Sequence, residues 1–340
     1  MYLPASGRPG LRGRGARRCA TMNEARAKSD SSTHDEARPA QLAGSSSAEA
    51  SSSLHRYHAA PDLQRQLERS RFSGKWSAPK GIAEDNDKIL GGGGFLLGDG
   101  QSVEVPAVAA ELVTGLPNED SAATTSTLLF PATSFCVANV DTLTAALVLG
   151  DACALNHANA ATPGGRYRHG GRAQEEDLCR CLPQLWPSLE SAAISGWYPL
   201  HPSSVLVSRS LLAVRRVGTY ERCASLGTVT ILTAAMPCGV ADRRPAGGWA
   251  NSPWAVDVRP CVRAVLHAAR STGRPNLVLG AFGCGAFGNP AGPVAAIFRD
   301  LLRSDEFRGA FKRVVFAVLD PLGTGNIGPF RKELASLADA

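Results

Sequence analysis

Short apolar runs alternate with helical segments over most of the second half of the chain, and this alternation constrains the fold more than any other feature. Strands are expected at SFCVANV, ACALNHA, TVTILTAAM, NLVLGAF and RVVFAVLD, between residues 134 and 320. Helices are expected at DTLTAALVLG and over residues 254–270 and 292–303. Buried strands that alternate with helices predict a layered α/β domain with a parallel or mixed sheet.

The region before this alternation contains two further expected elements. FLLGDGQSVEV (residues 95–105) predicts two short strands around a Gly-Asp-Gly turn. PAVAAELVTG (residues 106–115) has a proline near its start and a glycine at its end, and it therefore predicts a helix. We expect an accessory segment over residues 81–133 and the main domain over residues 134–340.

Residues 1–80 differ in composition from the rest of the chain. They are rich in Ser, Ala, Gly and Arg without a sustained period of 2 or 3.6, which predicts a disordered basic tail. They hold 14 Lys and Arg against 7 Asp and Glu, whereas the other residues hold 22 and 23, so the net charge of +6 belongs to the tail. The five arginines before Glu24 are compatible with an organelle transit peptide, a solvated tail, or an extension upstream of initiation near Met22.

Nine cysteines are present, an odd number without a C-x-x-C pair. Most lie in apolar runs, which predicts reduced, buried thiols and a reducing compartment. Cys179 and Cys181 would point to different faces of a helix and have no accompanying His pair, so we expect no metal site. Because no apolar run reaches 18 residues, we expect no membrane helix. The reduced cysteines suit an intracellular location, cytoplasmic or nuclear, with organelle targeting by the Arg-rich N-terminus as an alternative.

The segment PGGRYRHGGRAQEEDLCR (residues 163–180) joins a glycine-rich loop to two adjacent carboxylates at the start of an expected helix. Gly164 and Gly165 would let backbone N–H groups approach a ligand closely, which suits phosphate or ribose oxygens. Glu175 and Glu176 would repel a phosphate unless they face an uncharged part of the same ligand. A nucleotide sugar satisfies both requirements.

A second glycine-rich segment, GAFGCGAFGN (residues 280–289), leaves an expected strand toward an expected helix. A tight connection would account for one or two glycines, but four stand within nine residues. Backbone amides gathered near a helix N-terminus form an anion site. Because ligands of such sheets bind beyond the carboxyl ends of the strands, we expect both glycine loops at one edge of the sheet.

These segments resemble the signature of the poly(ADP-ribose) glycohydrolases, in particular the compact bacterial-type branch. The resemblance rests on the glycine run followed by Gln-Glu-Glu, on ALNHANAATPGG before it and on LVLGAFGCGAFGN after it, and it covers the chain from about Phe95 onward. It implies a macrodomain-like three-layer α/β/α sandwich with a mixed, largely parallel sheet and an N-terminal accessory segment. It also implies hydrolysis of the ribose–ribose O-glycosidic bonds of poly(ADP-ribose), with release of ADP-ribose and without metal or cofactor.

The resemblance further implies roles for individual residues. Glu176 would be the general acid that protonates the leaving oxygen and then activates water, and Glu175 would hold ribose hydroxyls. Phe287 would pack against the ribose that is cleaved and would partly bury Glu176, raising its pKa. The expected substrate-binding residues are Asn159, Gly164, Gly165, Arg166, Gln174, Gly283, Cys284, Gly285, Ala286, Phe287, Gly288, Asp141 and Asn326.

Some of these residues also have ordinary structural explanations. Asp141 is placed to cap a helix, and Asn159 is placed to form a turn. Arg166 stands where the family usually has a third consecutive glycine; its cation could serve the diphosphate, or its side chain could crowd the loop. This departure leaves open a non-hydrolytic ADP-ribose reader or a weakened enzyme. A phosphatase or hydrolase of another nucleotide derivative also stays open, because one sequence does not fix the substrate.

The expected partners follow from the same resemblance. They are poly(ADP-ribose) and ADP-ribose, with ADP-ribosylated proteins as substrates. We expect no direct reading of DNA, no membrane association, and a monomeric chain.

Overall fold

A computed structural model describes residues 55–77, 79–114, 129–238, 252–321 and 325–339. The strands are β1 (Arg56–Ala59), β2 (Gly94–Leu96), β3 (Ser102–Glu104), β4 (Ala110–Val113), β5 (Ala132–Ala138), β6 (Ala152–His157), β7 (Val205–Leu212), β8 (Thr228–Ala234), β9 (Asn276–Leu279) and β10 (Arg313–Ala317). The helices are α1 (Pro61–Ser70), α2 (Ile82–Gly91), α4 (Thr142–Leu149), α5 (Gln174–Cys181), α6 (Leu185–Ile194), α7 (Pro253–Ser271), α8 (Ala291–Arg303) and α9 (Ile327–Ala335), with 3-10 turns at Tyr167–His169 and Ser336–Asp339.

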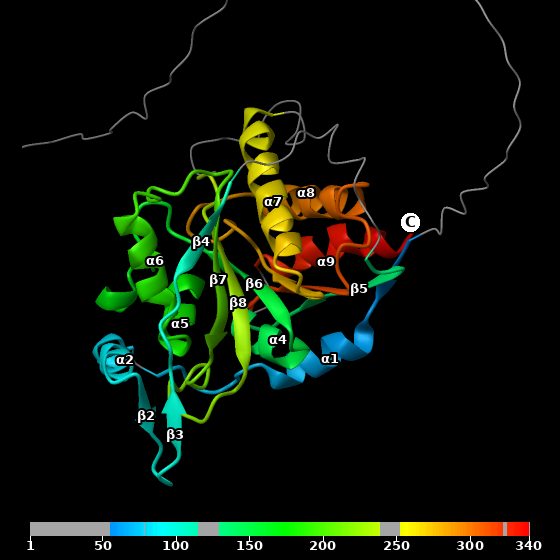
Figure 1. Ribbon diagram of the computed structural model, residues 1–340. Helices are drawn as coiled ribbons and strands as arrows, with labels where there is room; N and C mark the ends of the chain where they lie inside the picture. Colours follow the sequence, from blue (N-terminus) through cyan, green and yellow to red (C-terminus); the bar gives the residue numbers. More distant parts are fainter. Residues whose placement is uncertain (1–54, 78, 115–128, 239–251, 322–324, 340) are drawn as a thin grey trace, which may run out of the picture. The chain divides into compact units, whose positions relative to one another are not determined.

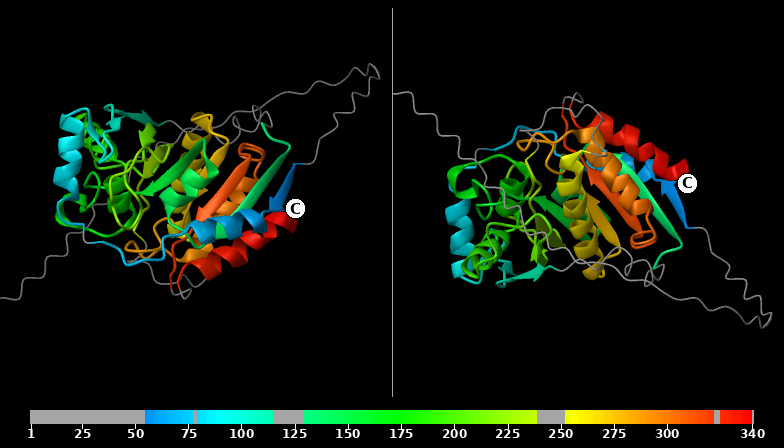
Figure 2. Two further views of the ribbon diagram at one scale, coloured as in Figure 1. Left: turned by 90° about the horizontal axis from the view of Figure 1, so that it is seen from below. Right: turned by 90° about the horizontal axis from the view of Figure 1, so that it is seen from above.

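The described residues form one eight-stranded mixed sheet in the order β1-β5-β10-β9-β6-β8-β7-β4. The strands from β1 to β8 in this order pair in parallel, and β7 and β4 complete one edge antiparallel. Helices α1, α4, α5 and α6 pack against one face, and α7, α8 and α9 pack against the other (Figures 1 and 2). The predicted three-layer α/β/α sandwich is therefore confirmed.

The strand β6 shows why the central strands are largely apolar. Successive side chains of a strand point to opposite faces of the sheet. Ala154 accordingly contributes to the core beneath α4 and α5, whereas Cys153 and Leu155 contribute to the core beneath α7 and α8. Because helices cover both faces, a polar residue in this strand needs partners, and the Asn156 amide donates to Glu175 and Thr233.

The helix α4 begins and ends where its sequence predicts. The Asp141 side chain accepts a hydrogen bond from the backbone N–H of Thr144 (2.8 Å), and Gly150 follows the last turn. This cap fixes the chain as it leaves the carboxyl end of β5. The hairpin expected over residues 95–105 is also present, as the antiparallel pair β2 and β3.

The helix predicted over residues 106–115 is wrong. Residues Ala110–Val113 form the edge strand β4 instead, which pairs antiparallel with β7 from Ala110 opposite Ser208 to Val113 opposite Val205. The proline and glycine that suggested a helix mark the ends of an extended segment equally well. The open edge of β7 supplies hydrogen-bond partners that outweigh the weak helix propensity of a short alanine-rich stretch.

The prediction of disorder up to residue 80 is wrong for residues 56–70. Strand β1 pairs in parallel with β5, the Tyr57 hydroxyl donates to the Leu302 carbonyl, and α1 buries Leu67 completely. Each element is short and contributes few apolar side chains, so no sustained period appears in the sequence. The domain therefore draws on residues well before 134. Residues 1–54 of the predicted tail lie outside the described residues.

Candidate active site

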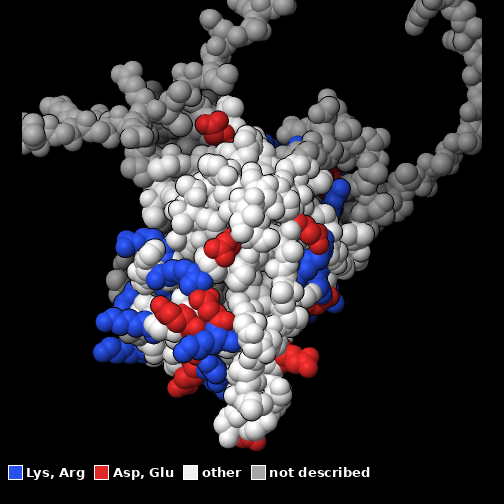
Figure 3. Space-filling model, turned by 60° about the vertical axis from the view of Figure 1, so that its left-hand side comes forward, with Lys and Arg blue, Asp and Glu red and all other residues white. Residues whose placement is uncertain are grey.

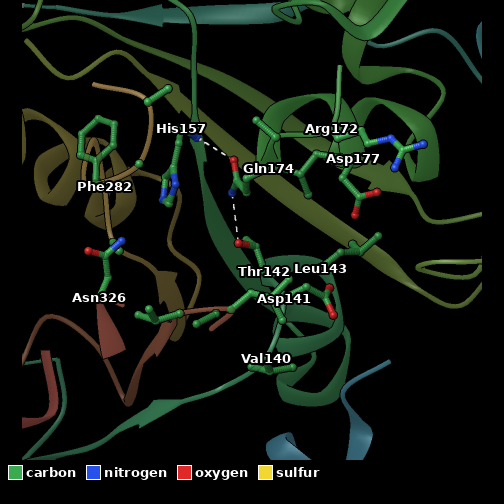
Figure 4. Close-up of a pocket in the computed structure, with 18 of the residues that line it drawn as sticks. Val140, Asp141, Thr142, Leu143, His157, Arg172, Gln174, Asp177, Phe282 and Asn326 are labelled. Carbon is green, nitrogen blue, oxygen red and sulfur yellow. Dashed lines mark hydrogen bonds between the residues drawn. The ribbon is translucent and has the colours of Figure 1, made fainter. Parts of the chain in front are cut away.

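A pocket of about 580 Å³ lies beyond the carboxyl ends of four neighbouring parallel strands (Figure 4). Val140 and Asp141 follow β5, Val318 follows β10, Phe282 follows β9, and His157 ends β6. Because these strands run in the same direction, the segments that follow them meet at one edge of the sheet. The predicted location of the site at that edge agrees with the pocket.

Gln174, the first residue of α5, forms hydrogen bonds to β6 and α4 in the wall of this pocket (Figure 4). Its Oε1 accepts from the backbone N–H of His157 (2.9 Å). Its Nε2 donates to the Leu155 carbonyl (2.7 Å) and to the Thr142 hydroxyl (3.1 Å). Gln174 was expected to bind substrate, but both amide donors are used within the protein, so its side chain joins α5 to β6 and α4.

Glu176 lies at the start of α5 and is only 7% exposed. Its Oε2 accepts from the backbone N–H of Ala173 (2.8 Å), and its Oε1 accepts from the backbone N–H of Arg166 (2.9 Å). The first bond satisfies an N–H group that the helix leaves without a partner. The second bond anchors the glycine loop, so this carboxylate links the loop to the helix.

Glu175 is 3% exposed and turns toward β6. Its Oε2 accepts from the backbone N–H of Asn159 (2.8 Å), and its Oε1 accepts from the Asn156 side chain (3.4 Å). Burial is the main reason that the pKa of Glu175 is raised to about 8, and the charge of Glu176 adds to it, whereas these hydrogen bonds oppose the shift. The Glu175 carboxyl therefore favours its protonated form at neutral pH.

The first glycine loop closes directly over the two carboxyl groups. Gly165 has a φ of +57°, and a Cβ added there would lie 2.7 Å from Glu176 Oε1 and 3.0 Å from Glu175 Oε2. Gly164 has a φ of +67°, and a Cβ there would lie 2.6 Å from Trp186 Cδ1. Both positions therefore require glycine, for backbone conformation and for space.

Arg166 does not have the geometry of a glycine position. Its φ is −101°, which any residue can adopt, and its side chain is exposed. Its backbone N–H still holds Glu176. The arginine in place of a third glycine is therefore accommodated without crowding the loop backbone.

The second glycine loop is held by Asn289. Its Nδ2 donates to the carbonyls of Pro237 (2.9 Å) and Gly283 (3.0 Å), and its Oδ1 accepts from Trp254 Nε1 (2.7 Å). Gly285 is exposed at the pocket, and Phe287 is partly buried against it. The loop thus presents backbone to the pocket shortly before α8 begins, as expected of an anion site.

The predicted site residues fall into two groups. Those that line the pocket are Asp141, Gln174, Gly283, Gly285, Ala286, Phe287 and Asn326. Those that lie behind its wall or outside it are Asn159, Gly164, Gly165, Arg166, Glu175, Glu176, Cys284 and Gly288. The Glu176 carboxyl group lies directly behind the pocket wall, because it binds the N–H of Ala173, which is itself a lining residue.

Two of these residues fill the structural roles that the sequence also allowed. Asn159 Oδ1 accepts from the backbone N–H groups of Ala161 (2.9 Å) and Thr162 (3.0 Å), which is turn chemistry. Asp141 caps α4 through Oδ1, whereas its Oδ2 is buried without a hydrogen-bond partner among the described residues.

Several lining residues were missed by sequence reasoning. Asp177 and Tyr220 face the pocket together, with the Tyr220 hydroxyl donating to Asp177 Oδ1 (2.6 Å), and burial raises the pKa of Asp177 to about 6. Trp76 and Arg172 also line it. Trp76 lies within the segment predicted to be disordered, and the aromatic pair Phe72 and Trp76 in an otherwise polar stretch is the signal that could have drawn attention to it.

Other features of the described residues bear on the chemistry. They contain no cluster of three or more His, Cys, Asp or Glu side chains able to hold a metal ion. Their cysteines are unpaired and mostly buried, with Cys238 exposed. No helix among them has the length and apolar character needed to cross a membrane.

Comparison with known proteins places these features in a family context. The model of the microbial-type PARG catalytic domain matches residues 83–212. The poly(ADP-ribose) glycohydrolase of Deinococcus radiodurans, solved in complex with ADP-ribose, is 34% identical with a TM-score of 0.58, over 67% of this chain and 95% of that chain. A search of curated proteins found no match.

A second solved relative covers more of this chain. The poly(ADP-ribose) glycohydrolase of Thermomonospora curvata is 28% identical with a TM-score of 0.64, over 75% of this chain and 98% of that chain. The same enzyme bound to the inhibitor ADP-HPD matches with a TM-score of 0.60. Nearly the full length of both relatives is therefore represented in this chain.

Proposed function

This chain belongs to the microbial-type poly(ADP-ribose) glycohydrolase family, and we propose that Glu175 and Glu176 form the acid–base centre of that activity. The enzyme is a glycosidase that hydrolyses the ribose–ribose bonds of poly(ADP-ribose) and releases ADP-ribose. One observation supports the assignment of the centre above all. Two buried carboxyl groups lie under a glycine loop beside a pocket at the carboxyl edge of a parallel sheet.

We assign the proton transfer to Glu176. Its carboxylate binds the N–H of Ala173 in the pocket wall, whereas the oxygens of Glu175 are directed to Asn156 and Asn159 on the side of β6. Glu176 donates a proton to the leaving ribose oxygen as the bond to the anomeric carbon breaks. Water then attacks that carbon and returns its proton to Glu176. Glu175 positions ribose hydroxyls.

The remaining binding roles follow the arrangement of the pocket. The second glycine loop, with Gly283, Gly285 and Ala286, binds the diphosphate through backbone N–H groups near the start of α8. Phe287, partly buried at the pocket, packs against the ribose that is cleaved. Asp141, with one carboxyl oxygen lacking a partner, and Asn326 flank the adenine.

The function is tested by identifying the product from labelled poly(ADP-ribose). Free ADP-ribose supports the glycohydrolase. Fragments that carry AMP would indicate cleavage of the diphosphate instead. Binding of ADP-ribose without any release from polymer would leave a reader domain as the function.

The carboxyl assignment is tested by Glu176→Gln and Glu175→Gln. Glutamine keeps the size and much of the hydrogen bonding of Glu176 but carries no transferable proton, so turnover should fall by about a hundredfold or more while ADP-ribose affinity changes little. Glu175→Gln should lower both. Glu190→Gln, an exposed carboxylate on α6, is the matched control and should behave as wild type. Full turnover in Glu176→Gln would remove that residue from the mechanism.

We also propose that the enzyme acts as a monomer and accepts polymer attached to proteins. Gly285 and Ala286 are exposed at the pocket, so a tethered chain can reach it. Among the described residues, large exposed apolar side chains lie on separate elements, such as Leu96 on β2, Ile194 on α6 and Val256 on α7, which favours a monomer. Light scattering and release of ADP-ribose from a modified protein test these two points.

A further inference from the structure

Asn86 is a buried amide on helix α2 of the accessory segment, and it binds residues of the main domain. Helix α2 packs against α5, which carries the two carboxyl groups (Figure 1), and Asn86 is only 1% exposed. Its Nδ2 donates to the Tyr167 hydroxyl (2.9 Å) and to the carbonyls of Cys179 (3.2 Å) and Arg180 (3.1 Å). Its Oδ1 accepts from Arg215 Nε (2.8 Å). Because an arginine can only donate, this bond fixes which way the amide faces.

Two of these bonds complete the carboxyl end of α5. A helix leaves its last four carbonyls without partners within the helix. The carbonyl of Cys181, the last residue of α5, accepts from the N–H of Val214 (3.2 Å). The carbonyls of Cys179 and Arg180 accept from Asn86. No glycine directly follows α5 in the sequence, so a side chain of α2 takes the place of the usual glycine cap.

The Tyr167 hydroxyl links the same amide to the first glycine loop. Tyr167 is buried and directly follows the loop, and its backbone N–H donates to the Gly164 carbonyl (3.0 Å). Arg166, the residue before it, donates its backbone N–H to Glu176 (2.9 Å). A shift of Tyr167 would therefore move the N–H group that holds Glu176.

Glu176 joins the same two elements as Asn86. Its Oε1 binds the loop at Arg166, and its Oε2 binds the start of α5 at Ala173. If the loop moved relative to α5, one of these bonds would lengthen and the carboxyl group would turn. Asn86 holds the loop through Tyr167 and holds α5 through its last carbonyls, so it fixes the gap that Glu176 bridges.

Helix α2 also forms ion pairs at the surface. On the face in Figure 3, basic and acidic side chains lie intermixed in one patch. Asp87 binds Arg168, the residue after Tyr167, through both guanidinium NH groups (2.9 Å each). Exposed ion pairs contribute little to stability and weaken with salt. The buried amide of Asn86 is therefore the contact by which α2 holds the loop most firmly.

We propose that Asn86 is a positioning residue for catalysis, which holds the first glycine loop and α5 in the arrangement that directs Glu176 to the substrate. The proposal rests on the function proposed for the carboxyl pair. Asn86 is not among the described residues that line the pocket. It therefore acts through Tyr167 and α5, and it leaves unchanged the second glycine loop, to which we assign the diphosphate.

The test compares Asn86→Ala with wild type in single-turnover release of ADP-ribose from poly(ADP-ribose). The rate should fall by about tenfold or more, because displacing a catalytic group by about 1 Å can reduce turnover by about a hundredfold. The Kd for ADP-ribose, measured by calorimetry, should stay within about twofold, because the loss concerns the chemical step. A general loss of structure would change both quantities.

Ile89→Ala is the matched control for stability. Ile89 lies on the same helix, is equally buried, and packs with Val103, Val105 and Val214, none of which belongs to the glycine loop. Thermal unfolding should show a lower Tm for Ile89→Ala as well as for Asn86→Ala. Ile89→Ala should nevertheless keep the wild-type rate per folded molecule.

Tyr167→Phe is a milder test, because it removes only the hydroxyl that Asn86 binds. The single-turnover rate should fall by about threefold or more, since one neutral hydrogen bond to the loop is lost, and the Kd for ADP-ribose should not change. In the Asn86→Ala background the same substitution should have no further effect, because the two residues act through one contact.

Several results would overturn the proposal. An unchanged rate in Asn86→Ala, or in Tyr167→Phe should Asn86→Ala fail to fold, would remove the positioning role. An equal fall in rate in Ile89→Ala would reduce the effect to the stability of α2. A loss of ADP-ribose affinity as large as the fall in rate would mean that Asn86 shapes the whole pocket. If wild type releases no ADP-ribose, the proposed function itself fails, which the wild-type assay alone reveals.

Discussion

Replacing Gly165 by alanine tests whether the glycine loop sets the position of the carboxyl pair. The new Cβ would lie 2.7 Å from Glu176 Oε1 and 3.0 Å from Glu175 Oε2, and both distances are too short for contacts with a methyl group. One or both carboxyl groups, or the loop itself, must move. Gly170→Ala is the matched control, because Gly170 also has a positive φ (+75°), but its nearest neighbour would be Pro79 Cγ at 3.9 Å.

In both variants the alanine must adopt a left-handed backbone conformation, but only Gly165→Ala displaces the carboxyl groups or the loop. A left-handed conformation costs an alanine about 1–2 kcal/mol. In a domain of this size that corresponds to a fall in Tm of roughly 2–8 °C for Gly170→Ala, and a somewhat larger fall for Gly165→Ala. Displacing a catalytic group by about 1 Å can reduce turnover by about a hundredfold. Only Gly165→Ala should show that second loss.

Thermal unfolding and single-turnover release of ADP-ribose from polymer, measured well below the transition, separate the two effects. We expect Gly170→Ala to retain nearly wild-type turnover per folded molecule and Gly165→Ala to lose about two orders of magnitude. Equal turnover in the two variants would refute the reasoning, because the carboxyl groups would then not depend on the loop for their position.

Three further predictions concern pH, the second loop and the N-terminal elements. Because the pKa of Glu175 is raised in the folded state to about 8, the free energy of unfolding should fall as the pH rises from about 5 to about 8 and this group loses its proton. Chemical denaturation should show a smaller fall for Glu175→Gln than for wild type over that range. Asn289→Ala removes the bonds to Pro237 and Gly283, so denaturation should show a loss of about 1–3 kcal/mol and calorimetry a weaker affinity for ADP-ribose. Truncation through residue 75 removes the buried Tyr57 and Leu67 and should lower Tm sharply relative to truncation through residue 54, an effect that composition alone does not predict.

The elements that sequence predicted correctly are those with complete local signals. The helix α4 has its cap, Asp141, and its terminating Gly150 within ten residues, and the central strands are apolar on both faces. The elements that were missed depend on distant partners. Strand β1 exists because β5 lies beside it, and β4 exists because β7 has a free edge. Neither condition is visible in the short segments themselves.

The site divides in the same way. The sequence shows directly that the glycine loop and the two glutamates are close together, because both lie within a segment of fewer than twenty residues. The sequence could not show that the Gln174 side-chain amide donates to the Leu155 carbonyl and the Thr142 hydroxyl, because these residues lie 19 and 32 positions away in the chain. Trp76 and Tyr220 come still further from the motif, and only the fold brings them to the pocket.

The adjacency of Glu175 and Glu176 also limits the mechanism. In ordinary two-carboxylate glycosidases the two groups flank the sugar from opposite sides. Here both extend from one helical turn, about 100° apart, and both lie near the same glycine, Gly165. They cannot enclose the anomeric carbon between them. One residue must therefore release the proton to the leaving oxygen and then take a proton from water, while its neighbour orients the ribose. The contacts of the two carboxyl groups, Glu176 with the glycine loop and the pocket wall and Glu175 with β6, suit that unequal division.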